Sequence, residues 1–191
     1  TTAGSSTALG YEALYTNTGA SNTAVGSTAL NLNTTGTNNT AVGERSLLSN
    51  TTASYNTAIG VSTLRQNTTG GYNTAIGLQA MRDNTTGTVN VAIGFDSLKA
   101  NTTASGNIAI GERALTKNTI GADNVACGNR ALTNNISGSR NAFFGAAAGY
   151  YVTGASNTGI GTNAGTAVTS GSYNAFLGDY ADTNSSSRTY N

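Results

Sequence analysis

The chain has 191 residues, of which 37% are hydrophobic and only 9% charged, and its net charge is +1. An ordinary globular domain is about 25% charged, and the basic residues here are scattered singly, which excludes the electrostatic footprint of a nucleic-acid or anionic-membrane binder. No apolar run approaches the roughly 20 residues that a membrane helix needs.

A five-residue segment recurs along nearly the whole chain, for example as Asn22-Thr23-Ala24-Val25-Gly26 and again at 56–60 and 73–77. The glycine that closes this pentapeptide stands at positions 10, 26, 43, 60, 77, 94, 111, 128, 145, 161 and 178. The steps are 17 residues, apart from two of 16. The sequence therefore contains eleven copies of one unit, with two single-residue deletions.

Each copy continues with a small residue, a leucine and a polar turn, as in Ala29-Leu30 followed by residues 33–36 (Asn-Thr-Thr-Gly). Asn, Thr and Gly are turn residues, and a unit this short cannot bury its own apolar face unless copies stack. We therefore predict an all-β fold, a parallel β-solenoid or β-roll of eleven rungs, about 50 Å long at ~4.8 Å per strand. The second half of each rung, such as 112–117, is equally compatible with a strand or a single helical turn.

The copies divide the chain into three parts. Copies one to eight form a regular rod over residues 1–140, copies nine to eleven form variant repeats over 141–182 that continue the rod, and 183–191 is a tail or linker to a following domain.

Alternation along a strand predicts which residues share a face. The fourth pentapeptide position is apolar in every copy, so we expect it to line the interior, packed against a column of leucines and one methionine. The fourth-position residues are Leu9, Val25, Val42, Ile59, Ile76, Ile93, Ile110, Cys127, Phe144, Ile160 and Leu177; the second column is Leu14, Leu30, Leu47, Leu64, Met81, Leu98, Leu115 and Leu132.

The opposite face would then carry asparagine, alanine and glycine. Small side chains in a column indicate close approach of another backbone, so we predict that neighbouring chains of a homotrimer pack there, with the asparagines forming amide ladders. Alternatively, alanine is simply a small, tolerated surface residue. The predicted seam consists of Ala24, Ala41, Ala58, Ala75, Ala92, Ala109, Ala126, Gly43, Gly60, Gly77, Gly94 and Gly111.

The last three copies replace the alanine by Phe143, Gly159 and Phe176, and the leucine by Gly149, Gly165 and Asp182. Repacking at the end of the rod is one explanation. The other is a contact tip, for which exposed tyrosines would supply anchors. The candidate surface-contact residues are Tyr150, Tyr151 and Tyr180. Tyr55 and Tyr72 occupy equivalent positions on adjacent rungs, either as a similar ledge or as a simple packing pair.

The sequence contains few of the residue types that catalysis uses. The chain has no histidine and a single cysteine, Cys127, which falls in the predicted interior column as a small buried hydrophobe. We therefore predict no catalytic, metal or cofactor site and no disulfide. The eight carboxylates are expected to form a solvated rim with the nearby basic residues Arg45, Arg82, Arg113 and Lys117. Paired glycosidase carboxylates across subunits are the enzymatic alternative.

The pentapeptide and its spacing resemble the repeats of YadA-like trimeric adhesin heads, and resemble more closely the NTAIG repeats of bacterial and phage tail-fibre-domain proteins. The resemblance spans nearly the whole chain and implies a trimeric β-roll. The 17-residue period is longer than in the adhesin heads. A trimerising chaperone, coiled coil or anchor is not recognisable in the sequence.

The sequence thus predicts a structural or adhesive fibre segment, a shaft or head of a phage tail fibre or bacterial surface adhesin, extracellular and self-associating, that projects or forms a site for a host-surface glycan or protein. Its neighbours would be other fibre domains. Alternatives are a subunit of an extracellular filament, an ice-binding solenoid, and a trimeric polysaccharide depolymerase. The paired threonines of the turns disfavour ice binding, since adjacent strand residues point to opposite faces.

Overall fold

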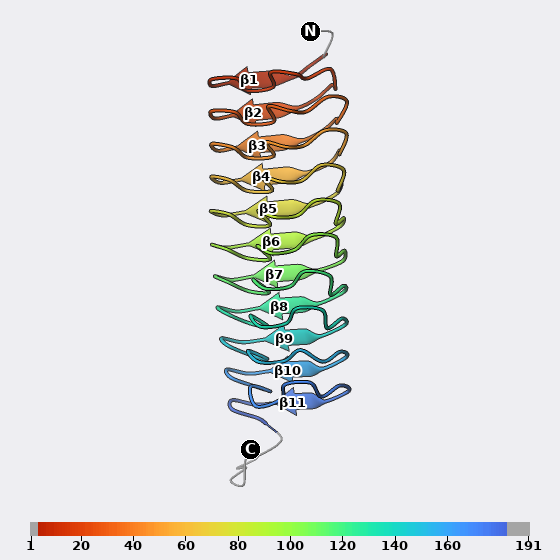
Figure 1. Cartoon of the computed structure of the whole chain (residues 1–191). Helices are drawn as coiled ribbons and strands as arrows, with labels where there is room; N and C mark the ends of the chain where they lie inside the picture. Colours follow the sequence, from red (N-terminus) through yellow and green to blue (C-terminus); the bar gives the residue numbers. More distant parts are fainter. Residues whose placement is uncertain (1–3, 183–191) are drawn as a thin grey trace.

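The computed structural model describes residues 4–182, which form one parallel sheet of eleven strands stacked in sequence order (Figure 1). The expected tail at 183–191 lies outside the described residues. The strands are β1 (Thr7–Leu9), β2 (Thr23–Val25), β3 (Thr40–Val42), β4 (Thr57–Ile59), β5 (Thr74–Ile76), β6 (Val91–Ile93), β7 (Ile108–Ile110), β8 (Val125–Cys127), β9 (Ala142–Phe144), β10 (Thr158–Ile160) and β11 (Ala175–Leu177). The predicted all-β parallel solenoid is confirmed.

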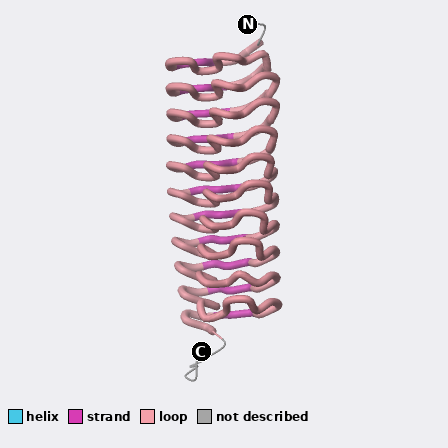
Figure 2. The backbone as a smooth tube through the Cα atoms, viewed as in Figure 1, coloured by secondary structure: helices cyan, strands magenta, loops and turns pink. Residues whose placement is uncertain are grey.

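Each rung, the turn of the coil that carries one strand, lies on its neighbour in the register of the sequence repeat. Ala58 pairs with Ala75, and Ala75 pairs with Ala92. The same pairing holds where a copy is one residue shorter, as between β9 and β10. Loops make up most of each rung, and the strands form a single column along the coil (Figure 2). Every residue therefore lies above its counterpart in the next copy.

The second half of the rung is neither a strand nor a helical turn, and no segment of residues 4–182 is helical. Its leucines have left-handed backbone angles, with φ of 49° at Leu64, and the backbone bonds the next rung through Leu64 N–H and the Ala80 carbonyl at 3.0 Å. This conformation buries two consecutive side chains, Thr63 and Leu64, completely. It costs about 1–2 kcal/mol for a residue with a Cβ, which burial of a leucine, at about 1.5–3 kcal/mol, offsets.

The core contains the alanines, and the prediction of its lining was wrong. Ala58 and Ala75 are fully buried against the leucine column, whereas Ile59 and Ile76 are 39% and 36% exposed. The fourth pentapeptide position therefore faces outward along the whole sheet. The physical reason is the width of the coil: leucines entering from the opposite side fill the interior, which leaves room only for a methyl group.

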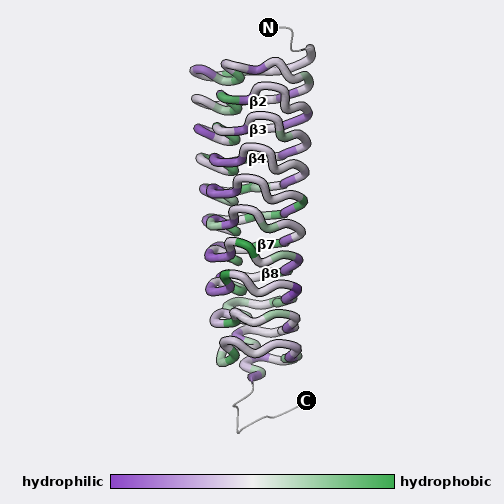
Figure 3. The backbone as a smooth tube through the Cα atoms, turned by 45° about the vertical axis from the view of Figure 1, so that its right-hand side comes forward, coloured by the Kyte–Doolittle hydropathy of each residue, from purple (hydrophilic) through white to green (hydrophobic). Residues whose placement is uncertain are grey.

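Two ladders of buried asparagines hold the rungs together, inside the coil rather than on an outer seam. In the first, the pentapeptide asparagine of one rung accepts a hydrogen bond on Oδ1 from the backbone N–H of the next, as from Asn73 to Asn56 at 2.9 Å. In the second, side-chain amides bond one another, as Asn67 Nδ2 donates to Asn50 Oδ1 at 3.0 Å and to the Gly70 carbonyl at 2.9 Å. Hydrophilic residues, the buried asparagines among them, recur at the two sides of each rung (Figure 3).

The variant rungs exchange bulk between the two sides of the core. Phe143 replaces the strand alanine and is fully buried, while Gly149 replaces the leucine opposite. A Cβ on Gly149 would lie 2.7 Å from Phe143 Cδ1. Gly165, which replaces the leucine after β10, meets Phe176 of the next rung, where a Cβ would lie 2.7 Å from Cδ2. The sheet continues through these rungs, since β8 pairs with β9 in register, so repacking at the end of the rod accounts for the buried substitutions.

The second asparagine ladder ends at Asn135, whose Oδ1 has no hydrogen-bond partner because Val152 occupies the next rung. Asn67→Val would leave the buried Asn50 Oδ1 without a donor. Asn135→Val only moves the unpaired acceptor from 135 to Asn118. We therefore expect Asn67→Val to reduce the free energy of unfolding by about 1–3 kcal/mol more than Asn135→Val, measured by urea denaturation. Equal losses would contradict the ladder as a source of stability.

The exchange of bulk predicts strong coupling between Phe143 and Gly149. Phe143→Ala should cost about 3–5 kcal/mol through the cavity that it leaves. Gly149→Leu alone should also destabilise, because the new side chain would overlap the ring. Together they restore the alanine–leucine pair of the regular rungs, so the double variant should be more stable than either single one. Additive losses in this double-mutant cycle would show that the two positions do not share one space.

Candidate functional site

The outer face of the sheet is the candidate functional surface of the coil. It consists of the second and fourth pentapeptide residues of each rung, two outward side chains per strand from β1 to β11, and none of them is charged. Isoleucines dominate its middle: Ile108 and Ile110 are 36% and 40% exposed, and Ile93 is 36% exposed. The outward pairs are smaller at β8, with Val125 and Cys127, and at β9 Ala142 stands beside Phe144, which is 43% exposed.

The predicted seam residues lie elsewhere, which corrects the seam prediction. Ala24, Ala41, Ala58, Ala75, Ala92, Ala109 and Ala126 are all 0% exposed inside the coil, so no second chain can reach them. The glycines Gly43, Gly60, Gly77, Gly94 and Gly111 do meet another backbone closely, but it is the next rung of the same chain. A Cβ on Gly60, where φ is +132°, would lie 2.5 Å from the Gly77 carbonyl oxygen. Stacking within one coil therefore explains the small residues.

An uncharged, β-branched outer face is unusual for a sheet in water. Parallel sheets occur almost only with both faces covered, and here the coil itself covers only the inner face. Contiguous exposed apolar surface commonly marks an interaction site. The arrangement offers broad, non-directional burial to a partner surface of matching shape, and it carries no groups for acid–base or nucleophilic chemistry.

Two lines of side chains border the outer face. We call the residue before each pentapeptide the leading flank and the residue after each glycine the trailing flank. On the leading flank, the rings of Tyr55 and Tyr72 stack at 4.9 Å between centroids and 11° between planes. On the trailing flank, Leu78 is 46% exposed and Phe95 is 38% exposed. The tyrosine pair was expected from the sequence, whereas the trailing flank was not.

The candidate surface tyrosines do not form one site. Tyr150 and Tyr151 contact each other edge to face, with centroids 4.8 Å apart and planes at 83°, and Tyr151 is 55% exposed. Tyr180 is 66% exposed two rungs further along. The rings of Tyr150 and Tyr151 are therefore the one aromatic contact among these three residues in the described part of the chain.

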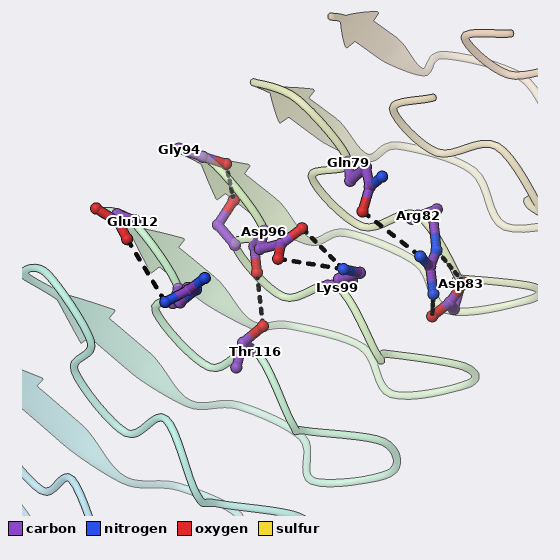
Figure 4. A network of polar contacts seen from close by, with 10 residues as sticks. Gln79, Arg82, Asp83, Gly94, Asp96, Lys99, Glu112 and Thr116 are labelled. Carbon is purple, nitrogen blue, oxygen red and sulfur yellow. Dashed lines mark hydrogen bonds and ion pairs between the residues drawn. The ribbon is translucent and has the colours of Figure 1, made fainter. Parts of the chain in front are cut away.

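Several charged side chains are paired locally, in the turns that follow the sheet, and Figure 4 shows the pairs of Arg82 with Asp83 and of Lys99 with Asp96. Arg82 bonds Asp83 at 2.7 Å, Lys99 lies 3.0 Å from Asp96 and Arg45 lies 3.5 Å from Glu44. Arg113 lies 3.9 Å from Glu112, and Lys117 bonds Asn134 instead of a carboxylate. The half-exposed pairs Arg45–Glu44 and Arg113–Glu112 contribute little stability, about 0–1 kcal/mol each, whereas the carboxylate of the Lys99–Asp96 pair is buried.

In residues 4–182 no group of three or more histidine, cysteine or acidic side chains is arranged to hold a metal ion. Because the same range contains no helix, none of it forms an apolar helix of membrane-spanning length.

Cys127 belongs to the outer face and not to the interior, which corrects its predicted position. It is partly exposed at the end of β8, between Ile110 of β7 and Phe144 of β9. Partial burial raises the pKa of its thiol, because desolvation disfavours the thiolate.

The raised pKa makes Cys127 a slow nucleophile at neutral pH, because the thiolate is the reactive form. Alkylation by iodoacetamide should therefore accelerate over a higher pH range than for a free cysteine derivative measured beside it. A midpoint at or below that of the free thiol would contradict the burial of this side chain.

No family model, curated protein or solved structure matches this chain.

Proposed function

We propose that this chain is a structural segment of an extracellular adhesive fibre, a shaft or head of the kind found in phage tail fibres and bacterial surface adhesins. Three copies pack their outer faces around a common axis. The segment holds or forms a site for a host-surface glycan or protein, with Tyr151 and Tyr180 as exposed anchors. Its role is mechanical and adhesive, without catalysis.

The observation that carries this proposal is the uncharged outer face. It runs unbroken over all eleven strands and combines threonine, valine and isoleucine, residues that pack well on a pleated surface. A second copy of the chain supplies a partner face with the same length and the same rung spacing. Self-association is therefore the simplest way to cover both sides of this parallel sheet.

The width of the face suits three copies. From Tyr72 to Leu78 the chain takes six residue steps, at most about 20 Å, because only Thr74–Ile76 form the strand. Three faces of that width arranged as a triangle place the axis at most about 6 Å from each face, close to half the ~10 Å between packed sheets. Isoleucine side chains can fill that distance. The length, about 50 Å at the strand spacing, and the continuous register suit a stiff spacer.

Light scattering after size-exclusion chromatography tests the assembly directly. We expect the full chain to elute with three times the 19.1 kDa mass of one copy. A single monodisperse species with the mass of one copy would overturn the proposal.

Ile93→Lys identifies the surface responsible. It would place one ammonium group from each copy at the same level of a dry seam, where burial of unpaired charge costs several kcal/mol, so we expect monomers with unchanged circular dichroism. Thr86→Lys is the matched control, because Thr86 is exposed in a turn away from the outer face, and it should leave the mass unchanged. If both variants keep the mass of the unaltered chain, the outer face is not the interface.

A further inference from the structure

The two flanks of the outer face match each other in character over most of the rod. In rungs 4, 5 and 6 the leading flank carries Tyr55, Tyr72 and Val89, and the trailing flank of the same rungs carries Val61, Leu78 and Phe95. All six side chains are between 38% and 63% exposed. In rungs 2, 3 and 10 both flanks are polar instead: Ser21 with Ser27, Asn38 with Glu44, and Ser156 with Thr162. Rungs 7 and 8 carry no apolar side chain on either flank, whereas rungs 1, 9 and 11 are mixed: Ser5 with Tyr11, Arg140 with Ala146, and Tyr173 with Asp179. The apolar character of the two flanks therefore rises and falls together over the seven consecutive rungs 2 to 8.

Packing within one chain cannot produce this match. The two flank residues of a rung lie on opposite sides of the strand, with the outward side chains of its second and fourth pentapeptide residues between them, so they do not touch. The backbone does not favour the apolar choice either. The leading-flank position is left-handed, with φ of 62° at Tyr55, 60° at Tyr72 and 58° at Val89, a conformation that is unusual for bulky and especially for β-branched residues. Most other rungs place Ser, Asn, Gly or Asp there, apart from Arg140 in rung 9 and Tyr173 in rung 11.

We infer that the leading flank of one copy packs against the trailing flank of the next copy at the same level, so that the copies are parallel and in register. This inference rests on the proposed self-association. Rotation about an axis along the rod brings the leading flank of one copy to the trailing flank of its neighbour without a change of height. Tyr72 then meets Leu78 of the next copy, and Val89 meets Phe95. The flanks close the seam at its corners and keep water from the isoleucines.

The charges of rung 8 agree with this arrangement. Asp123 stands on the leading flank, and Arg130 stands beside the trailing flank, two residues after Gly128. Both are exposed, and neither side chain makes an ion pair within the described part of its own chain. In-register packing places them at the same corner, where opposite charges fix the register of an interface.

An antiparallel pair would destroy both matches. It would bring like flanks together with the order of rungs reversed, so that rung 5 meets rung 7. Tyr72 would then face Gly106, and Leu78 would face Glu112. The apolar side chains of rungs 4 and 5 would lose their partners.

Cysteine cross-linking in a Cys127→Ser background tests the register. With Tyr72→Cys and Leu78→Cys in one chain, oxidation should link most copies into covalent dimers and trimers on non-reducing gels. The two cysteines cannot join within one chain, because their Cα atoms are much farther apart than the ~7 Å limit of a disulfide. Tyr72→Cys with Ser27→Cys is the matched control: it uses the same two flanks three rungs apart, about 14 Å in height, and should give little cross-linking.

The outcomes separate the two proposals. Cross-linking by the matched pair only supports the in-register flanks. Efficient cross-linking by the control pair would overturn the in-register packing. So would efficient cross-linking by Val89→Cys alone, because an antiparallel pair would bring the two copies of residue 89 together at rung 6. A three-copy mass in light scattering without cross-linking of the matched pair also overturns the flank contact while leaving self-association intact. A one-copy mass for the unaltered chain would instead refute the proposed self-association itself.

Discussion

The whole structure depends on the vertical stacking of equivalent residues at the spacing of β-strands. Because each rung repeats the register of the last, any side chain that bonds its own copy can do so along the rod. Asparagine uses this best, since its amide offers a donor on one side and an acceptor on the other. Asn50, Asn67 and Asn84 form such a chain of buried amides. The same stacking aligns the outer residues into continuous columns, from which the interaction surface arises.

The architecture could be predicted from the sequence because the period alone requires it. A unit of 17 residues without its own core has to stack, and the glycine positions fixed eleven rungs and the strand in each. The inside and outside of the strand could not be assigned by hydrophobicity. Ile76 looks more suited to a core than Ala75, but the coil is too narrow for isoleucine opposite Met81. The better signal was variation between copies: the interior position is alanine in eight rungs, whereas the outer one ranges from valine to phenylalanine.

The turns show a second limit of sequence reasoning. Leucine at a left-handed φ is disfavoured by local propensity, so no pattern of single residues points to it, and the segment around Leu115 suggested a helix or a strand equally. The choice is decided by tertiary packing, because the left-handed leucine is the one that reaches the interior beside Ala114. The flank contacts could not be predicted for a related reason. They depend on the position of a second copy of the chain and not on the local strand or turn structure.

The similarity of the rungs makes register errors possible during folding, and the variant rungs disfavour such errors. In a coil of interchangeable units, a strand that pairs one rung out of register would still place alanine against alanine. Phe143 admits no such error, because its ring needs the empty places of Gly149, Gly159 and Gly165, which occur together only near one end. Because the rungs follow one another along the chain, correct placement of this group determines the position of every other rung. The irregular end therefore sets the register in which the interchangeable rungs stack.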